Sequence, residues 1–187
     1  MKSIMIAIVV FQMTFLQILS SPTQVLGVSC TWDGTAGNWG DKDRWDCDQV
    51  PGEEDDVYFP SGNLSVNESI RVKSFTQSGG NLVGAGNLTA DTITWSAGWM
   101  KGTGSTTALI EAKFLGSNFL TLDGRTFNNA GTLSYSRSSS NYLYLYTAET
   151  VFNNLSGGTF SIDDGMVKAV GGSGTFNNEG RVVKTSL

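Results

Sequence analysis

Short runs of alternating apolar and polar residues fill the chain from about residue 58 onward. Examples are "NLTADTITW", "TLSYS", "YLYLY", "TFSI" and "RVVKTS", and glycine, asparagine and serine separate them. Short runs with this period-two alternation, bounded by turn residues, are typical of β-strands. After Gly27, apolar residues never keep helical spacing for more than two turns. With 23 glycines and few charged residues, the pattern predicts an all-β protein.

The strand-like runs also recur at a regular interval. The triplet Phe-Asn-Asn begins at Phe127, Phe152 and Phe176, in steps of 25 and 24 residues. The segments "SGNLSVNESI" and "AGNLTADTIT" share a G-N-L-S/T frame 24 residues apart. The segments "GTGST" at Gly102 and "GSGTF" at Gly172 are separated by close to three such steps. Repeats of this length indicate stacked structural units, so we expect a period of about 24 residues across the whole body.

Two all-β architectures have strands this short. A β-sandwich has no reason to repeat at a constant interval, whereas a parallel β-solenoid stacks each coil on the previous one at ~4.8 Å. We therefore predict a single-stranded parallel β-helix of about five or six coils. In it, the three phenylalanines stack as inward rungs and the asparagines form amide ladders at a corner. The pairs Asp123-Gly124, Gly157-Gly158 and Gly171-Gly172 mark further corners, where glycine tolerates positive φ.

The first residues read as a targeting segment. Lys2 is followed by "SIMIAIVVFQMTFLQILS", and no charged residue occurs between Lys2 and Asp33. A basic start, an apolar stretch and then small residues are typical of a secretory signal peptide, here residues 1–27. A membrane anchor is the alternative, but the apolar run is shorter than the ~20 residues that a spanning helix needs. We therefore expect an exported protein with no membrane span after removal of the signal.

Cysteine and histidine usage narrows the chemistry. The two cysteines, Cys30 and Cys47, are expected to pair in an oxidising compartment. A zinc site would need further ligands, and the chain has no histidine. The lack of histidine also excludes catalysis by Ser-His-Asp or Cys-His groups and histidine pH switches.

Negative charge gathers near the N-terminus. The net charge is −5, and residues 30–57 alone hold nine acidic residues against Lys42 and Arg44, a balance of −7. This distribution does not suit a nucleic-acid partner, which would need a basic surface. The segments "DKDRWDCD" and "EEDD" are rich in carboxylates, as calcium prefers, but they lack the glycine and terminal glutamate of an EF-hand loop. A solvated acidic face is the first interpretation and weak calcium or mineral binding is the second; no other cofactor is expected.

The acidic segment is also rich in tryptophan. A solenoid must cover the apolar core and strand edges of its first coil, so we interpret residues 28–57 as a cap over a body at residues 58–187. Trp32, Trp39 and Trp45 would form the lid, held by the Cys30–Cys47 disulfide. The alternative interpretation is a patch on which sugar rings stack.

Several segments resemble a class of secreted and surface solenoid proteins, best known from bacterial multi-repeat, adhesin-like chains. The segments are "LTADTITWSAGWMKGTGSTT", "LTLDGRTFNNAGTLSYS" and "TFNNEGRVVKTS". The stretch "WDGTAGNWGDKDRWDCDQVPGEEDDVYFP" is similar to the Trp-rich start of such solenoids and to the extracellular part of amnionless-type receptors. The resemblance implies an extracellular, structural or adhesive role without a shared active site.

The run "NYLYLYT" supplies the first candidate binding face. Alternation places Tyr142, Tyr144 and Tyr146 on one side and two leucines on the other. With the leucines inside, the tyrosines form a platform for sugar rings or for another protein. Ordinary surface tyrosines of a β-strand are the alternative interpretation.

Four N-x-S/T sequons provide candidate glycosylation sites. They are Asn63, Asn67, Asn87 and Asn154. In a eukaryotic secretory pathway they would carry glycans. A structural role at solenoid corners is the alternative, because Asn63 and Asn87 share the 24-residue frame.

An enzyme on a β-helix scaffold is a further interpretation. Glycoside hydrolysis needs two carboxylates at a controlled separation. Asp163 and Asp164 are sequence neighbours that a strand would point to opposite faces, and Asp123 lies more than one coil away.

We therefore expect a secreted, extracellular, non-catalytic structural or adhesive protein, associated with a matrix, cell wall or mineral. A carbohydrate-binding module or a polysaccharide-active enzyme is the alternative. Expected partners are matrix or surface components, polysaccharide among them. No obvious cap follows the last coil in the sequence, so end-to-end self-association and a truncated reading frame are both open interpretations.

Overall fold

The computed structural model describes residues 26–136, 142–163, 166–169 and 174–185. In this part of the chain, strands and one short 3-10 helix are joined by turns and bends. The elements are β1 (Ser29–Thr31), β2 (Ala36–Asn38), η1 (Lys42–Arg44), β3 (Asp56–Phe59), β4 (Asn63–Ser65), β5 (Ile70–Gln77), β6 (Asn81–Val83), β7 (Leu88–Trp95), β8 (Gly98–Lys101), β9 (Ser105–Phe114), β10 (Leu120–Asp123), β11 (Thr126–Asn129), β12 (Thr132–Tyr135), β13 (Tyr142–Leu145), β14 (Val151–Asn154), β15 (Thr159–Ile162), β16 (Met166–Ala169), β17 (Thr175–Asn178) and β18 (Arg181–Lys184).

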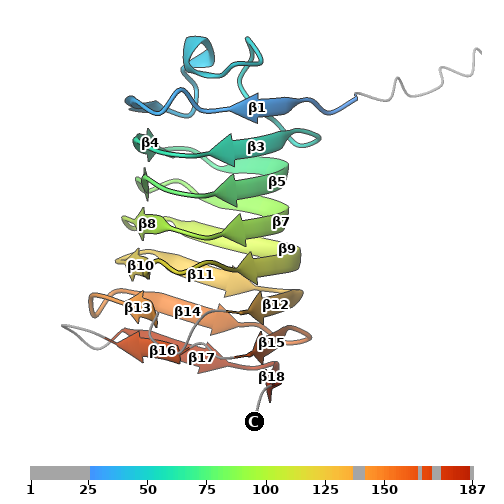
Figure 1. The fold of residues 1–187 in the computed structure, drawn as a ribbon, viewed down its shortest axis with the longest axis vertical. Helices are drawn as coiled ribbons and strands as arrows, with labels where there is room; N and C mark the ends of the chain where they lie inside the picture. The colour runs from blue at the N-terminus through green and yellow to red at the C-terminus, as the bar shows by residue number, and fades with distance from the viewer. Residues whose placement is uncertain (1–25, 137–141, 164–165, 170–173, 186–187) are drawn as a thin grey trace, which may run out of the picture.

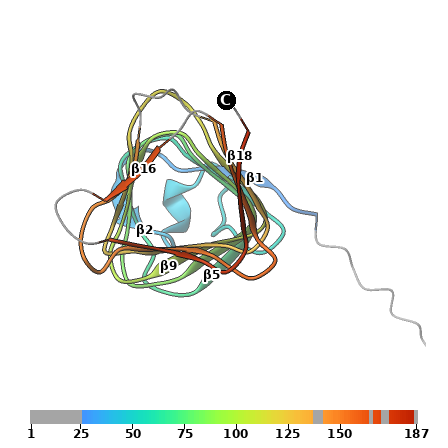
Figure 2. The same cartoon turned by 90° about the horizontal axis from the view of Figure 1, so that it is seen from below.

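The strands wind into a parallel β-solenoid of about five turns, as the repeat predicted. Figure 1 shows the coils stacked from the blue N-terminal end to the red C-terminal end, and Figure 2 looks along the stack. One sheet follows the order β1-β3-β5-β7-β9-β11-β14-β17, with β12, β15 and β18 beside it. The other follows β2-β4-β6-β8-β10-β13-β16. Each strand pairs with a strand of the next coil, so equivalent residues lie above one another.

The coils change shape halfway along the stack. The long strand β9 pairs with two successive strands of the next coil, β11 through its first half and β12 through its second. The turn between β11 and β12 contains Gly131, where an added Cβ would come within 2.0 Å of the carbonyl oxygen of Ile110. Only glycine lets the backbone approach so closely. From this coil onward, one long side has become two shorter ones.

The three Phe-Asn-Asn triplets form the predicted column. Phe127, Phe152 and Phe176 are register partners, and the successive ring centroids lie 5.3 and 5.4 Å apart. Their asparagines form two amide ladders of opposite hydrogen-bond direction. The inner ladder contains Asn129, Asn154 and Asn178, and the outer ladder contains Asn128, Asn153 and Asn177.

The predicted 24-residue period is wrong for the first half of the body. There the coil is shorter, and the same place in it recurs at Asn63, Asn81 and Trp99, which are successive register partners. Asn87 is therefore not equivalent to Asn63, and the shared G-N-L-S/T frame is a coincidence of turn residues. The steps lengthen only from Ser105 onward, because the later coils contain an additional corner. The three-coil relation between Ser105 and Thr175 is confirmed.

The acidic N-terminal segment closes the upper end of the solenoid. Its strands β1 and β2 pair with β3 and β4, so the segment provides a first rung as well as a cover. The predicted Cys30–Cys47 disulfide is present. Trp32, Trp39 and Trp45 are almost completely buried, with centroids of neighbouring rings 4.9 and 5.0 Å apart. Buried rings offer no surface to a sugar, so the lid interpretation holds and the stacking-patch interpretation is wrong.

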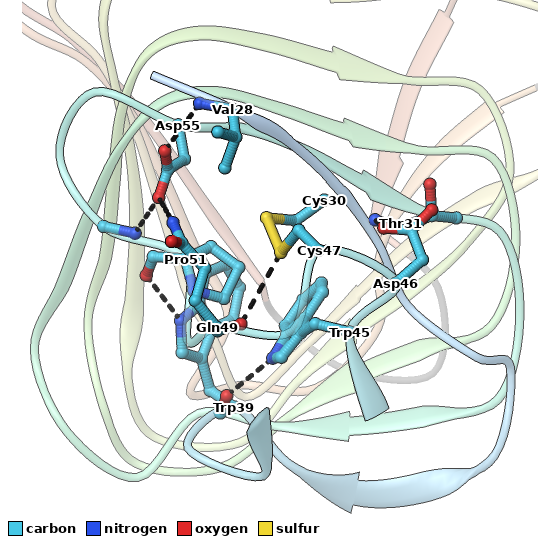
Figure 3. Close-up of a disulfide and its surroundings, with 11 residues drawn as sticks. Val28, Cys30, Thr31, Trp39, Trp45, Asp46, Cys47, Gln49, Pro51 and Asp55 are labelled. Atoms are coloured by element: carbon cyan, nitrogen blue, oxygen red, sulfur yellow. Dashed lines mark hydrogen bonds between the residues drawn. A yellow bond between two sulfur atoms is a disulfide. The ribbon is translucent and has the colours of Figure 1, made fainter. Parts of the chain in front are cut away.

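Backbone groups hold this cover in place (Figure 3). The Trp39 indole donates to the carbonyl oxygen of Pro51, and the Trp45 indole donates to that of Trp39. The buried carboxylate of Asp55 accepts hydrogen bonds from the backbone N–H groups of Val28 and Gly52, at 2.8 Å each. Charge-assisted hydrogen bonds are stronger than neutral ones. The Asp55 carboxylate therefore holds the backbone segments of Val28 and Gly52 firmly together.

Candidate functional site

The tyrosine strand β13 lies as its alternation predicted. Leu143 and Leu145 are buried in the core, while the side chains of Tyr142 and Tyr144 are half-buried on the outer face. Tyr146 follows the strand and is 42% exposed. The three tyrosines therefore face outward from the seven-stranded sheet.

Two further aromatic residues join this face from neighbouring coils. Trp99 on β8 contacts Tyr146, with 5.5 Å between ring centroids. Phe119, just before β10, lies 5.2 Å from the Tyr144 ring and is stacked on the Tyr142 ring at 6.2 Å. We call these five residues the aromatic face. The sequence pattern did not indicate Trp99 and Phe119, because their proximity to the tyrosines depends on a register that a 24-residue period does not give.

Thr121 lies at the centre of the aromatic face. It is the register partner of Trp99 on one side and of Tyr144 on the other. Its small side chain, only 4% exposed, forms the floor of a pocket of about 280 Å³. The walls are Trp99, Phe119, Tyr144 and Tyr146. Among the residues that the structure describes, the Thr121 hydroxyl has no hydrogen-bond partner.

Two charged residues of opposite sign lie beside the pocket. The ammonium group of Lys101 lies over the Trp99 ring, 4.0 Å from its centroid, which is a cation–π contact. The register partner of Lys101 on the next coil is Asp123. One cation and one anion thus flank the aromatic face on the same side.

The buried side chain of Arg125 links three successive coils by hydrogen bonds. The sequence pattern did not indicate this residue. Arg125 is fully buried and donates to the Thr106 hydroxyl and to the carbonyl oxygens of Gly84, Gly86 and Ser105. Burial lowers the pKa of Arg125 to about 10, so the guanidinium stays charged at neutral pH. Its partners are neutral, and four hydrogen bonds compensate for the loss of water. The group is structural.

Three of the four sequon asparagines are exposed. Asn63, Asn67 and Asn87 lie on the first coils with their side chains accessible. The Asn67 amide donates to the Asn38 side chain, while Asn87 accepts from the backbone N–H and the hydroxyl of Ser105. These positions are compatible with glycans in the folded protein.

The fourth sequon asparagine, Asn154, is fully buried in the inner ladder. Its Nδ2 donates to the Asn178 side chain and to the carbonyl oxygen of Arg181. A glycan on this nitrogen would have to occupy the core. Asn154 therefore has the structural role that was predicted for the asparagines of the Phe-Asn-Asn triplets.

Several carboxylates of the cap accept hydrogen bonds from groups within the cap or form ion pairs there. Asp33 accepts from Thr35 and pairs with Arg44, and the hydrogen bonds of Thr35 hold the pKa of Asp33 below its ordinary value. Asp46 accepts from the backbone N–H of Thr31. In the described part of the chain, no three Asp, Glu, Cys or His residues gather in a way that could hold a metal ion. Weak calcium binding at the cap stays a hypothesis.

Of the other carboxylates considered for hydrolysis, two lie within the described residues, on different elements. Asp123 is at the end of β10, and Asp163 lies in an exposed bend after β15. Asp164 is outside the described residues. At the C-terminal coil, Phe176 is 38% and Val182 43% exposed, and end-to-end association through this coil stays a prediction.

Comparisons with known proteins identify no relative. No family model matches the chain, and no curated protein or solved structure matches it significantly. The class that the structure itself defines is a disulfide-capped parallel β-solenoid. In the described ranges, no helix is long and apolar enough to cross a membrane. The likeness to adhesin-like surface proteins remains a hypothesis based on the quoted segments.

Proposed function

We propose that this protein is a secreted, non-catalytic adhesive protein of an extracellular matrix or cell wall that binds carbohydrate through its aromatic face. The observation that carries the proposal is the gathering of five aromatic side chains, from three neighbouring coils, on the outside of one sheet. The signal-like segment that ends at Gly27 and the disulfide of the cap support export, since disulfides persist in oxidising compartments.

Carbohydrate binding would use both the apolar faces and the polar groups of these side chains. Aromatic rings offer large apolar faces to the C–H groups of a sugar, and tyrosine hydroxyls and the tryptophan N–H offer hydrogen bonds at the rim. A β-solenoid presents such groups at the spacing of its rungs, and the closely packed core keeps them in place. The face is therefore preorganised for binding, and little conformational entropy is lost when a ligand arrives.

The test is binding of the secreted, full-length product to a glycan array and to insoluble polysaccharides. We expect binding that Trp99→Ala and Tyr144→Ala each weaken about tenfold, the order of magnitude of one lost stacking contact. Tyr58→Ala is the matched control, because Tyr58 is an outward tyrosine on β3 with 47% exposure and lies outside the aromatic face. Equal binding by all three variants, or no binding to any glycan, would refute the proposal.

A further inference from the structure

The pocket at Thr121 lies between the rungs of two aromatic residues. Trp99, Thr121 and Tyr144 occupy successive rungs of one outward column. Rungs are ~4.8 Å apart, so the backbones that carry Trp99 and Tyr144 are separated by about 9.6 Å. A ring held between two aromatic faces needs about 7–8 Å, twice the ~3.5–4.0 Å contact distance of carbon atoms. The small residue at the middle rung therefore leaves a hollow between the two aromatic rungs, where the pocket lies.

Ring contacts connect the walls of the pocket. Trp99 touches Tyr146 on one side, and Phe119 touches Tyr144 on the other. The resulting pocket of about 280 Å³ is just below the ~300–1,000 Å³ typical of small-molecule sites. A ring that enters from outside fits, whereas a polymer chain would have to leave through the aromatic walls. The geometry thus favours a projecting ring over an internal unit of a chain.

The chemistry of the lining selects the kind of ring. Aromatic walls from two rungs favour a ligand whose upper and lower faces are both apolar, as in a pyranose with every hydroxyl equatorial. An axial hydroxyl, as in galactose, would point at one of the aromatic rings. The Thr121 hydroxyl at the floor, which has no partner among the described residues, can hydrogen-bond one equatorial hydroxyl. Lys101 and Asp123 are register partners of opposite charge, so this pair does not favour an anionic sugar.

We infer that this pocket binds a single uncharged, gluco-configured pyranose at the non-reducing end or a branch of a glycan. The ring lies between Trp99 and Tyr144 and is hydrogen-bonded by Thr121. The inference rests on the proposed function and names the ligand class of the same site.

The experiment is a calorimetric titration of the secreted, full-length product. The ligands are methyl β-glucoside, methyl β-galactoside, methyl β-glucuronide and linear β-glucan oligomers of increasing length. We expect the glucoside to bind at least about tenfold more tightly than the galactoside or the glucuronide. Affinity per non-reducing end should change little with oligomer length, because only the terminal ring enters the pocket.

Substitutions at the floor test the hydrogen bond separately from the fold. Thr121→Val keeps the shape and β-branching of the side chain and should weaken glucoside binding about fivefold, while Thr121→Ser should retain it. Unchanged binding by Thr121→Val would contradict the role of the hydroxyl.

The two proposals fail differently. Affinity that rises steadily with oligomer length, or a preference for galactoside or glucuronide, overturns the inference and leaves carbohydrate binding by the aromatic face intact. If none of these ligands binds but other glycans on the array do, the inference is likewise overturned and carbohydrate binding by the aromatic face is left intact. Absence of binding to every glycan overturns both proposals.

Discussion

Removing the buried amide of Asn154 tests how much the inner ladder stabilises the C-terminal coils. In Asn154→Ala, the hydrogen bonds from Asn129 at 2.8 Å, to Asn178 at 2.7 Å and to the Arg181 carbonyl at 3.1 Å are lost. Each contributes a net ~0.5–1.5 kcal/mol, so the three together contribute about 1.5–4.5 kcal/mol. Because Asn129 and Asn154 are both fully buried, water cannot replace the lost partners. We therefore expect a loss of about 3 kcal/mol.

Asn153→Ala is the matched control on the same strand. Asn153 also bonds to asparagines of the coils above and below, at 2.9 Å each, but it belongs to the outer ladder, where Asn128 and Asn153 are only half-buried. Water can replace these bonds, so we expect a loss of about 1 kcal/mol or less.

The assay is urea unfolding followed by circular dichroism, with hydrogen exchange of the amides in β11, β14 and β17 as a local readout. A loss of about 3 kcal/mol corresponds to a decrease in melting temperature of about 6–12 °C for a chain of this size. If the two alanine variants differ by less than about 0.5 kcal/mol, the distinction between inner and outer ladders is refuted.

Three further predictions concern the framework and its modification. Arg125→Met should destabilise the protein by about 3 kcal/mol in thermal unfolding, since it leaves the carbonyl oxygens of Gly84, Gly86 and Ser105 without this donor; a neutral result would contradict the clamp role. Reduction of the disulfide, which joins cysteines 17 residues apart, should cost about 3 kcal/mol, measured by unfolding with and without reductant. Expression in a eukaryotic host should yield glycans only at the three exposed sequons, and mass-spectrometric detection of a glycan on folded Asn154 would refute its placement.

The sequence predicts the C-terminal half of the fold well because its repeat is written in the residues that stack. Phe127, Phe152 and Phe176 fill one core column, and each needs the same two amides after it. The Phe-Asn-Asn motif is easy to recognise in the sequence because its phenylalanine and its two asparagines all have a structural role in each coil that contains it.

The N-terminal half follows a different signal. There the coil repeats through backbone conformation: Gly62, Gly80 and Gly98 stand at the same place in successive coils, and all three adopt positive φ. Glycine is favoured at such corners because it lacks the Cβ that clashes in this conformation. In a chain with 23 glycines, this regularity was harder to recognise than the Phe-Asn-Asn word.

The candidate site was predicted only in part for the same reason. The outward direction of Tyr142 and Tyr144 follows from alternation within one strand, which is a local property. The central place of Thr121 depends on the register that pairs it with Trp99 in one coil and with Tyr144 in the next, and these coils differ in shape. The approach of Phe119 to the tyrosines depends on the same register. No local pattern specifies it.

The most direct test of the central claim uses the five tryptophans as reporters. Their indole N–H groups can be followed by two-dimensional NMR while methyl β-glucoside is titrated into ¹⁵N-labelled protein. Trp99 lines the pocket, whereas Trp32, Trp39, Trp45 and Trp95 are buried elsewhere. The account predicts a saturable shift of the Trp99 signal with the other four unchanged. A shift confined to the cap tryptophans, or no shift of the Trp99 signal at saturating sugar, would contradict it.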